Sequence, residues 1–155
     1  MKPQTSILMV CLGNICRSPL AEGLMRAKLN FTKFKVDSAG TGSGHKGEAP
    51  DKRSMDIAQK NKLDISQQRS RQLVQEDLEE FDYIYVMDES NLDDVKALAT
   101  TEEQRLKIKK ILEVPFPGEG LDVPDPYYGG SQGFVNIYRM LDQATDAIAK
   151  ELNTD

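Results

Sequence analysis

The sequence predicts an α/β protein with a parallel, doubly wound sheet. Short apolar segments typical of buried strands alternate along the chain with longer segments of helical periodicity. This alternation is expected to join parallel strands through right-handed helical crossovers. The first apolar segment runs straight into a compact loop, and parallel sheets bind ligands beyond the carboxyl ends of their strands. We therefore expect the functional site at that edge of the sheet.

Four segments are expected to form the strands, because each is short, apolar and bounded by turn or helix signals. They are Thr5 to Val10, Lys35 to Ser38, Tyr83 to Met87 and Lys107 to Leu112.

Helices are expected between and after these strands. Their ranges are Pro19 to Leu29, Arg53 to Lys60, Glu89 to Ala99 and Ser131 to the end of the chain. The second follows Pro50 and Asp51, a helix start signal. The last carries a nearly unbroken stripe with spacings of three and four residues, made by Phe134, Tyr138, Leu141, Thr145, Ile148 and Leu152. Two loops rich in glycine or proline, residues 40–47 and 114–130, are expected to border the site.

Composition narrows the class of protein. A chain of 155 residues with 39% apolar residues is expected to form one domain with its own core. A net charge of -5 argues against general binding to nucleic acids or anionic membranes. The start of the chain lacks the pattern of a signal sequence, and two cysteines in one loop do not suggest a disulfide framework, so we expect a cytoplasmic protein. Two cysteines and one histidine also make a weak metal-ligand set.

The loop after the first strand carries the strongest chemical signal. Residues Cys11 to Ser18 read C-L-G-N-I-C-R-S, between the strand and the first helix. The backbone N–H groups of such a loop can converge on an anion at the helix N-terminus, and the same positive environment favours a thiolate. The sequence therefore predicts an anion-binding loop with Cys11 as its nucleophile. The alternative is a buried structural cysteine beside a surface arginine.

Four motifs together resemble the low-molecular-weight protein tyrosine phosphatases. They read V-C-L-G-N-I-C-R-S-P at 10–19, D-S-A-G-T at 37–41, F-D-Y-I-Y-V-M-D-E-S-N at 81–91 and D-P-Y-Y at 125–128. The resemblance implies a single phosphatase domain over residues 1–155, a flavodoxin-like three-layer sandwich with a four-stranded parallel sheet. It also implies hydrolysis of phosphotyrosine or small aryl phosphates without metal or cofactor, by a monomer or weak dimer.

The resemblance also assigns roles to the loop residues. Cys11 would attack phosphorus, and Arg17 would bind two phosphoryl oxygens in a bidentate manner. Ser18 would donate to the Cys11 sulfur, while Asn14, held by Ser38, would shape the loop. The remaining phosphate-binding positions are Leu12, Gly13, Ile15 and Cys16.

Asp125 is the expected general acid, which would protonate the leaving phenolate. From the Asp-Pro pair alone, it could equally be a turn aspartate. Tyr127 and Tyr128 are expected to wall the substrate pocket, although either could simply anchor the loop. Many relatives carry an aromatic residue at Gly44 on the opposite wall, so we expect a more open pocket here.

Each of three further residues allows two interpretations. Cys16 is either a small apolar loop residue or the partner that traps oxidised Cys11 as a disulfide. His45 is interpreted as a solvated histidine rather than a catalytic base. Asp88 either supports the site through hydrogen bonds or caps the helix that begins near Glu89.

Two other functions compete with the phosphatase hypothesis. An arsenate reductase on the same fold would need further thiols beyond the loop, and the segment from Asp88 to Asn91 contains no cysteine. A catalytically silent phosphate-binding module would need one chemical group to be missing. Because Cys11, Arg17 and Asp125 are all present, the sequence favours the phosphatase.

Overall fold

The computed structural model describes residues 4–127 and 129–153. Its centre is a four-stranded sheet in the order β2-β1-β3-β4, in which all paired strands run parallel. The strands are β1 (Thr5–Cys11), β2 (Phe34–Gly40), β3 (Tyr83–Val86) and β4 (Ile108–Lys110). The predicted four-stranded parallel α/β fold is therefore confirmed. The last expected strand is shorter than predicted, because the chain turns into a short 3-10 helix, η1 (Ile111–Glu113), directly after β4.

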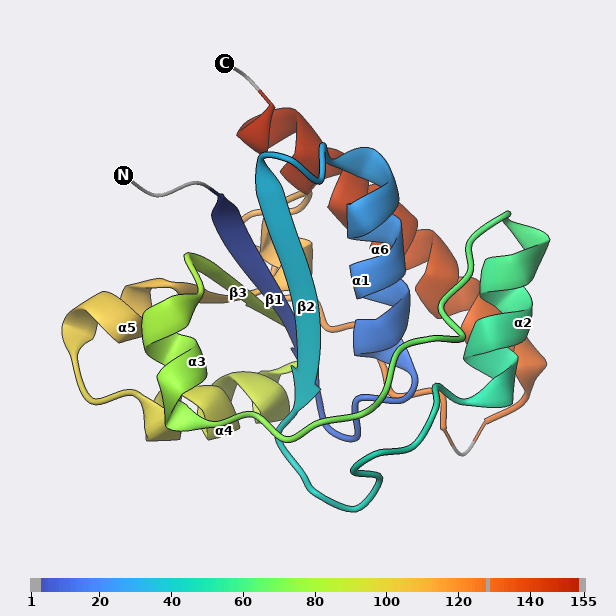
Figure 1. Cartoon of the computed structure of the whole chain (residues 1–155), viewed down its shortest axis with the longest axis horizontal. Helices are drawn as coiled ribbons and strands as arrows, with labels where there is room; N and C mark the ends of the chain where they lie inside the picture. The colour runs from blue at the N-terminus through green and yellow to red at the C-terminus, as the bar shows by residue number, and fades with distance from the viewer. Residues whose placement is uncertain (1–3, 128, 154–155) are drawn as a thin grey trace.

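Helices cover both faces of the sheet (Figure 1). Those that the sequence predicts are α1 (Arg17–Lys28), α2 (Lys52–Lys60), α4 (Glu89–Leu98) and α6 (Ser131–Leu152). Two short acidic helices were not predicted from the sequence. They are α3 (Gln75–Glu80) and α5 (Glu102–Leu106). With six and five residues, each is too short to show a helical repeat of apolar positions.

Strand β1 lies at the centre of two apolar cores. Its side chains alternate, so Ile7 and Met9 face the core that includes residues of α1 and α6, whereas Leu8 and Val10 face the core that includes residues of α3 and α4. All four side chains are fully buried. Burial on both faces explains why β1 reads as a continuous apolar run. No helix among the described residues is long and apolar enough to cross a membrane.

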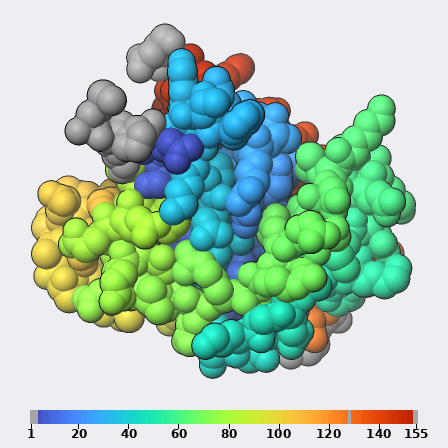
Figure 2. Space-filling model, in the orientation of Figure 1, coloured from blue at the N-terminus to red at the C-terminus, as the bar shows by residue number. Residues whose placement is uncertain are grey.

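The strands end together at the edge that carries the candidate site. In the register of the sheet, Cys11 on β1 lies opposite Gly40 on β2. A Cβ atom at Gly40 would lie 2.7 Å from the backbone oxygen of Leu12, so only glycine lets β2 approach the loop this closely. The segment that follows β2 forms the lower edge of the molecule in Figure 2, where the strand ends also lie in Figure 1.

Candidate active site

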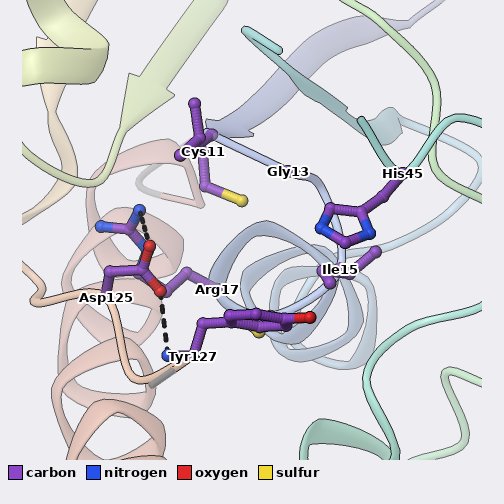
Figure 3. A pocket seen from close by; sticks show the side chains of 9 residues that line it. Cys11, Gly13, Ile15, Arg17, His45, Asp125 and Tyr127 are labelled. Atoms are coloured by element: carbon purple, nitrogen blue, oxygen red, sulfur yellow. Dashed lines mark hydrogen bonds and ion pairs between the residues drawn. The ribbon is translucent and has the colours of Figure 1, made fainter. Parts of the chain in front are cut away.

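A pocket opens at the carboxyl end of β1 (Figure 3). Most of its lining comes from the predicted anion-binding loop, and two distant segments complete it. The lining residues are Cys11, Leu12, Gly13, Ile15, Cys16, Arg17, His45, Asp125 and Tyr127. The fold thus brings the three predicted catalytic residues, Cys11, Arg17 and Asp125, into one cavity.

Cys11 is the last residue of β1, and its side chain is almost fully buried. Its sulfur points into the space beside Arg17 and Asp125 (Figure 3). The Sγ atom accepts a hydrogen bond from the backbone N–H of Asn14 at 3.3 Å and lies 3.0 Å from Ser18 Oγ. Helix α1 begins at Arg17, so the positive end of its dipole also faces this sulfur. Each of these features places a hydrogen-bond donor or partial positive charge at the sulfur.

Asn14 gives the loop its shape. Its backbone has a φ of 57°, in the left-handed region that asparagine tolerates better than most residues. Its side-chain Nδ2 donates to Ser18 Oγ at 2.8 Å and to Ser38 Oγ at 3.0 Å. Its Oδ1 accepts the backbone N–H of Arg71 at 3.0 Å. The loop is therefore tied to α1, to β2 and to the segment before α3.

Arg17 is held in place from behind. The side chain is 2% exposed, and its Nη1 donates to Asp88 Oδ2 at 2.6 Å and to the backbone oxygen of Val123 at 2.8 Å. Its Nη2 lies 3.8 Å from Asp125 Oδ2, on the side of the pocket. Asp88 also accepts the backbone N–H of Asn91 with Oδ1, which caps α4. Both interpretations of Asp88, support and cap, hold at once.

Asp125 lies at the rim of the pocket with its side chain 41% exposed. Its Oδ1 accepts the backbone N–H of Tyr127 at 3.0 Å, which is the local hydrogen bond expected of a turn aspartate. Its Oδ2 remains on the side of Arg17 and the pocket (Figure 3). The turn therefore directs the second carboxylate oxygen toward Arg17 and the pocket.

Two rings border the mouth of the pocket. The rings of Tyr127 and His45 have centroids 5.8 Å apart and are inclined by 54° (Figure 3). His45 Nδ1 lies 3.0 Å from Glu48 Oε1, which orients the imidazole. Gly44 is not among the lining residues, and Tyr128 lies outside the described residues. His45, rather than the position of Gly44, supplies the second wall.

Sequence reasoning missed the role of Arg53 on α2. Its Nη2 donates to the backbone oxygen of Tyr127 at 2.9 Å, and its Nη1 to that of Gly129 at 3.0 Å. The guanidinium also forms an ion pair with Asp51 and lies 4.5 Å from the ring centroid of Phe134. Arg53 thus ties the segment that carries Asp125 to α2 and α6. The only signal in the sequence is an ordinary helix start, Asp51 followed by Arg53.

Cys16 differs chemically from Cys11, although both thiols are free and buried. Burial, and secondly the negative charge of Asp51, raise the pKa of Cys16 to about 12. At neutral pH it is therefore a thiol, unsuited to act as the nucleophile. Among the described residues, no group of three or more His, Cys, Asp or Glu side chains could hold a metal ion.

Comparison with known proteins gives a consistent result. A sequence model of the family described as "Low molecular weight phosphotyrosine protein phosphatase" matches residues 6–155. A Schizosaccharomyces pombe protein of the same name is 38% identical over 146 residues, which cover 91% of this chain and 92% of that protein.

Solved structures show the same likeness. The crystal structure of a protein tyrosine phosphatase from Entamoeba histolytica superimposes with a TM-score of 0.89 at 35% identity, covering 96% of this chain and 97% of that one. Vibrio vulnificus Wzb, solved in complex with benzylphosphonate, gives a TM-score of 0.84 at 32% identity, covering 95% of this chain and 98% of that one.

Proposed function

This chain belongs to the low molecular weight phosphotyrosine protein phosphatase family, and we propose that Cys11 is the nucleophile with which it hydrolyses phosphotyrosine. The family acts on phosphoproteins or aryl phosphates. One observation carries the assignment to these residues. The Cys11 sulfur, the Arg17 guanidinium and the Asp125 carboxylate face one cavity, at the bottom, side and rim respectively.

In the first step, the Cys11 thiolate attacks phosphorus as the bond from phosphorus to the phenolic oxygen breaks. Arg17 binds two of the phosphoryl oxygens and stabilises the charge they carry. Asp125, in its protonated form, donates a proton to the departing phenolate, an effect typically worth about 10²- to 10⁴-fold. The products are tyrosine and a phosphocysteine.

In the second step, water attacks the phosphocysteine and Asp125 accepts a proton from it. The sulfur–phosphorus bond breaks, releasing inorganic phosphate and the thiolate. Ser18, 3.0 Å from the sulfur, stabilises that thiolate as it leaves. Arg17 keeps the phosphoryl oxygens in place throughout.

The rings of His45 and Tyr127 pack against each other at the mouth of the anion-binding pocket, so the aryl part of the substrate would lie against the surface that they form together. A flat phenyl group can pack on this aromatic surface while its phosphate enters the loop. Benzylphosphonate, the molecule in the Vibrio vulnificus Wzb complex, combines a phenyl ring with a phosphonate. This likeness supports phosphotyrosine over an alkyl phosphate.

The residues present support the two competing functions less well than they support the phosphatase. A thiol relay for arsenate reduction would need a cysteine beyond Cys11 and Cys16, and the sequence contains only these two. A silent binding module would lack a reacting group, whereas nucleophile, anion ligand and acid are all present at the pocket.

The charge and the cysteine content of the chain bear on its location, its oligomeric state and its partners. We propose a cytoplasmic monomer or weak dimer that acts on phosphotyrosine proteins and binds neither nucleic acid nor membranes. Two free cysteines suit a reducing compartment, and a net charge of -5 opposes binding to polyanions.

The test is hydrolysis of phosphotyrosine and of p-nitrophenyl phosphate, whose leaving group is more acidic. Cys11→Ser should abolish both activities. Asp125→Ala should lose more rate on phosphotyrosine than on p-nitrophenyl phosphate, because only the poorer leaving group needs the proton. Glu119→Gln, an exposed change in the same segment, is the control and should retain both rates. Substantial activity in Cys11→Ser would refute the mechanism, and equal losses in Asp125→Ala would refute its role as acid.

A further inference from the structure

We propose that Lys110 is a positioning residue for the general acid, because its ammonium group fixes the segment that carries Asp125 on the N-terminal side of that residue. Arg53 fixes the same segment on the C-terminal side. Lys110 is the last residue of β4 and does not line the pocket. The inference rests on the proposed function, since it assigns Lys110 to the support of the acid in that reaction.

The burial of Lys110 is unusual for its residue type. Within residues 4–127 and 129–153 it is the one buried lysine, and its side chain is only 9% exposed. An ammonium group loses its hydration when it is buried, which is costly unless charged or polar partners replace the water. Lys109, the preceding residue of β4, is exposed. The partners of Lys110 must therefore compensate for a cost that Lys109 does not incur.

Three oxygen atoms face the ammonium group, and they come from two segments. The Nζ atom donates to the backbone oxygen of Gly120 at 3.1 Å and to Asp122 Oδ1 at 2.9 Å, both shortly before Asp125. It also lies 3.3 Å from Glu89 Oε2, in the first turn of α4. The hydrogen bond with Asp122 raises the pKa of Lys110 against the desolvation that lowers it, so the group stays charged. Its three donors thus join the segment of Asp125 to α4.

The chain from these contacts to the acid is short. Val123 follows Asp122, and its backbone N–H donates to the backbone oxygen of Met87 at 2.8 Å. The backbone oxygen of Val123 accepts from Arg17 Nη1 at 2.8 Å. Asp125 comes two residues later and reaches the rim of the pocket (Figure 3). A displacement of Asp122 would therefore be passed on to the carboxylate of Asp125.

The turn before Asp122 needs such support because it contains glycines in a flexible conformation. Gly118 and Gly120 have φ values of 82° and 65°, in the left-handed region. Their backbone N–H groups donate to Glu113 Oε1 at 3.1 Å and Oε2 at 3.2 Å, which closes the turn upon itself. Lys110 then fixes the closed turn against α4. Without the ammonium group, the turn would keep its shape but lose this attachment.

Loss of the ammonium group should affect Asp125 more than Arg17. Arg17 keeps its ion pair with Asp88 at 2.6 Å, and Asp88 is fixed by its own cap on α4. Asp125 is exposed, and its carboxylate accepts the backbone N–H of Tyr127 within the same turn, so it moves with its segment. Phosphate binding should therefore persist while proton donation weakens.

Lys110→Met is the experiment, because methionine has a similar length but carries neither charge nor donor. Asp122 and Glu89 are exposed, so water can hydrate them and the fold should persist. The value of kcat/KM is measured on phosphotyrosine and on p-nitrophenyl phosphate, since it covers the steps up to loss of the phenol. We expect a fall of about fivefold on phosphotyrosine and of less than about twofold on p-nitrophenyl phosphate, because the poorer leaving group depends on the acid.

An Asp125→Ala background shows whether Lys110 acts through Asp125. There, Lys110→Met should change kcat/KM on phosphotyrosine by less than about twofold, because the acid that Lys110 positions is already absent. Lys109→Met is the matched control, since it removes the same charge from the neighbouring, exposed residue of β4. It should leave kcat/KM on both substrates unchanged. The inhibition constant of inorganic phosphate should be the same in Lys110→Met as in the parent protein.

The outcomes separate the inference from the proposed function. Unchanged activity or equal losses on the two substrates in Lys110→Met would overturn the role of Lys110, as would a loss that persists fully in the Asp125→Ala background or recurs in Lys109→Met. Cys11 and Asp125 would keep their roles, which Cys11→Ser and Asp125→Ala test by themselves.

A second variant keeps the inference testable if Lys110→Met does not fold. Asp122→Ala removes one of the three acceptors of Lys110 at an exposed position. A loss of about twofold or more, confined to phosphotyrosine, is expected, because the turn keeps only the contact through Gly120. Equal rates in Asp122→Ala and the parent protein would overturn the inference.

Discussion

Asp88 Oδ2 lies 2.6 Å from Nη1 of Arg17, an arginine whose side chain is only 2% exposed. The same carboxylate caps α4 through Asn91. The Asp88 side chain therefore links the N-terminus of α4, which packs in the core that contains Leu8 and Val10, to the anion-binding loop. The guanidinium consequently faces the pocket in a fixed orientation before any substrate arrives, which reduces the reorganisation needed during phosphoryl transfer.

Asp88→Asn should separate these two tasks. Asparagine is a good helix cap, so α4 should persist, but the charge opposite Arg17 disappears. We expect kcat on p-nitrophenyl phosphate to fall by about tenfold or more with little change in KM, and stability to fall by about 1 to 3 kcal/mol. Steady-state kinetics and urea unfolding measure both effects. Asp94→Asn, an exposed change on the same helix, should alter neither; an unchanged kcat in Asp88→Asn would contradict the orienting role.

Arg53→Lys should impair proton donation without disturbing phosphate binding. Lysine keeps the positive charge but cannot bond the backbone oxygens of Tyr127 and Gly129 in the planar arrangement that Arg53 uses. The segment of Asp125 should then be less well positioned. We expect a larger loss of kcat on phosphotyrosine than on p-nitrophenyl phosphate, with the inhibition constant of inorganic phosphate unchanged. A large rise in that constant would instead place the effect of Arg53 on the anion-binding loop.

The wall made by His45 predicts a change in aryl affinity. Removing the imidazole in His45→Ala leaves Tyr127 as the one ring of the pair and should raise KM for aryl phosphates by about three- to tenfold. Inhibition by inorganic phosphate, which has no ring, should not change. Gly44→Phe is the complementary variant, because no described atom lies within 4 Å of a Cβ at this position. The Gly44→Phe protein should fold normally and have a lower KM for aryl phosphates.

The outcome that would contradict the role of His45 is a fall in the affinity of His45→Ala for inorganic phosphate as well as for aryl phosphates. Such a result would indicate a general effect on the loop.

Oxidation should distinguish the two cysteines. Peroxide converts the Cys11 thiolate to a sulfenic acid, and attack by the Cys16 sulfur would form a disulfide and release water. Because the pKa of Cys16 is raised to about 12, its thiolate fraction increases about tenfold per pH unit between pH 7 and 9, and disulfide closure should accelerate accordingly.

Recovery of activity with dithiothreitol after a peroxide pulse measures this protection. Cys16→Ser should recover much less activity than the parent protein, and the parent should recover more at pH 8.5 than at pH 7. Recovery that is equal in the two proteins would show that Cys16 is only a small residue of the loop.

Local features of the chain were readable from sequence because they depend on residues close together. The run from Cys11 to Ser18, between a strand and a helix, predicts an anion-binding loop by itself. The stripe of α6 and the apolar run of β1 predict buried faces through their periodicity alone. The short helices α3 and α5 escaped because their stability comes from caps and contacts rather than from a repeat.

The sequence by itself determined the parallel α/β fold and the loop that presents Cys11. Only the tertiary structure decided which distant side chains support it: Asp88 and Asp125 beside Arg17, His45 beside Tyr127, Arg53 behind the segment of Asp125, and Ser38 against Asn14. The physical reason is that these partners come from separate loops and helices. Their distances depend on strand order, register and packing, which no short stretch of sequence encodes.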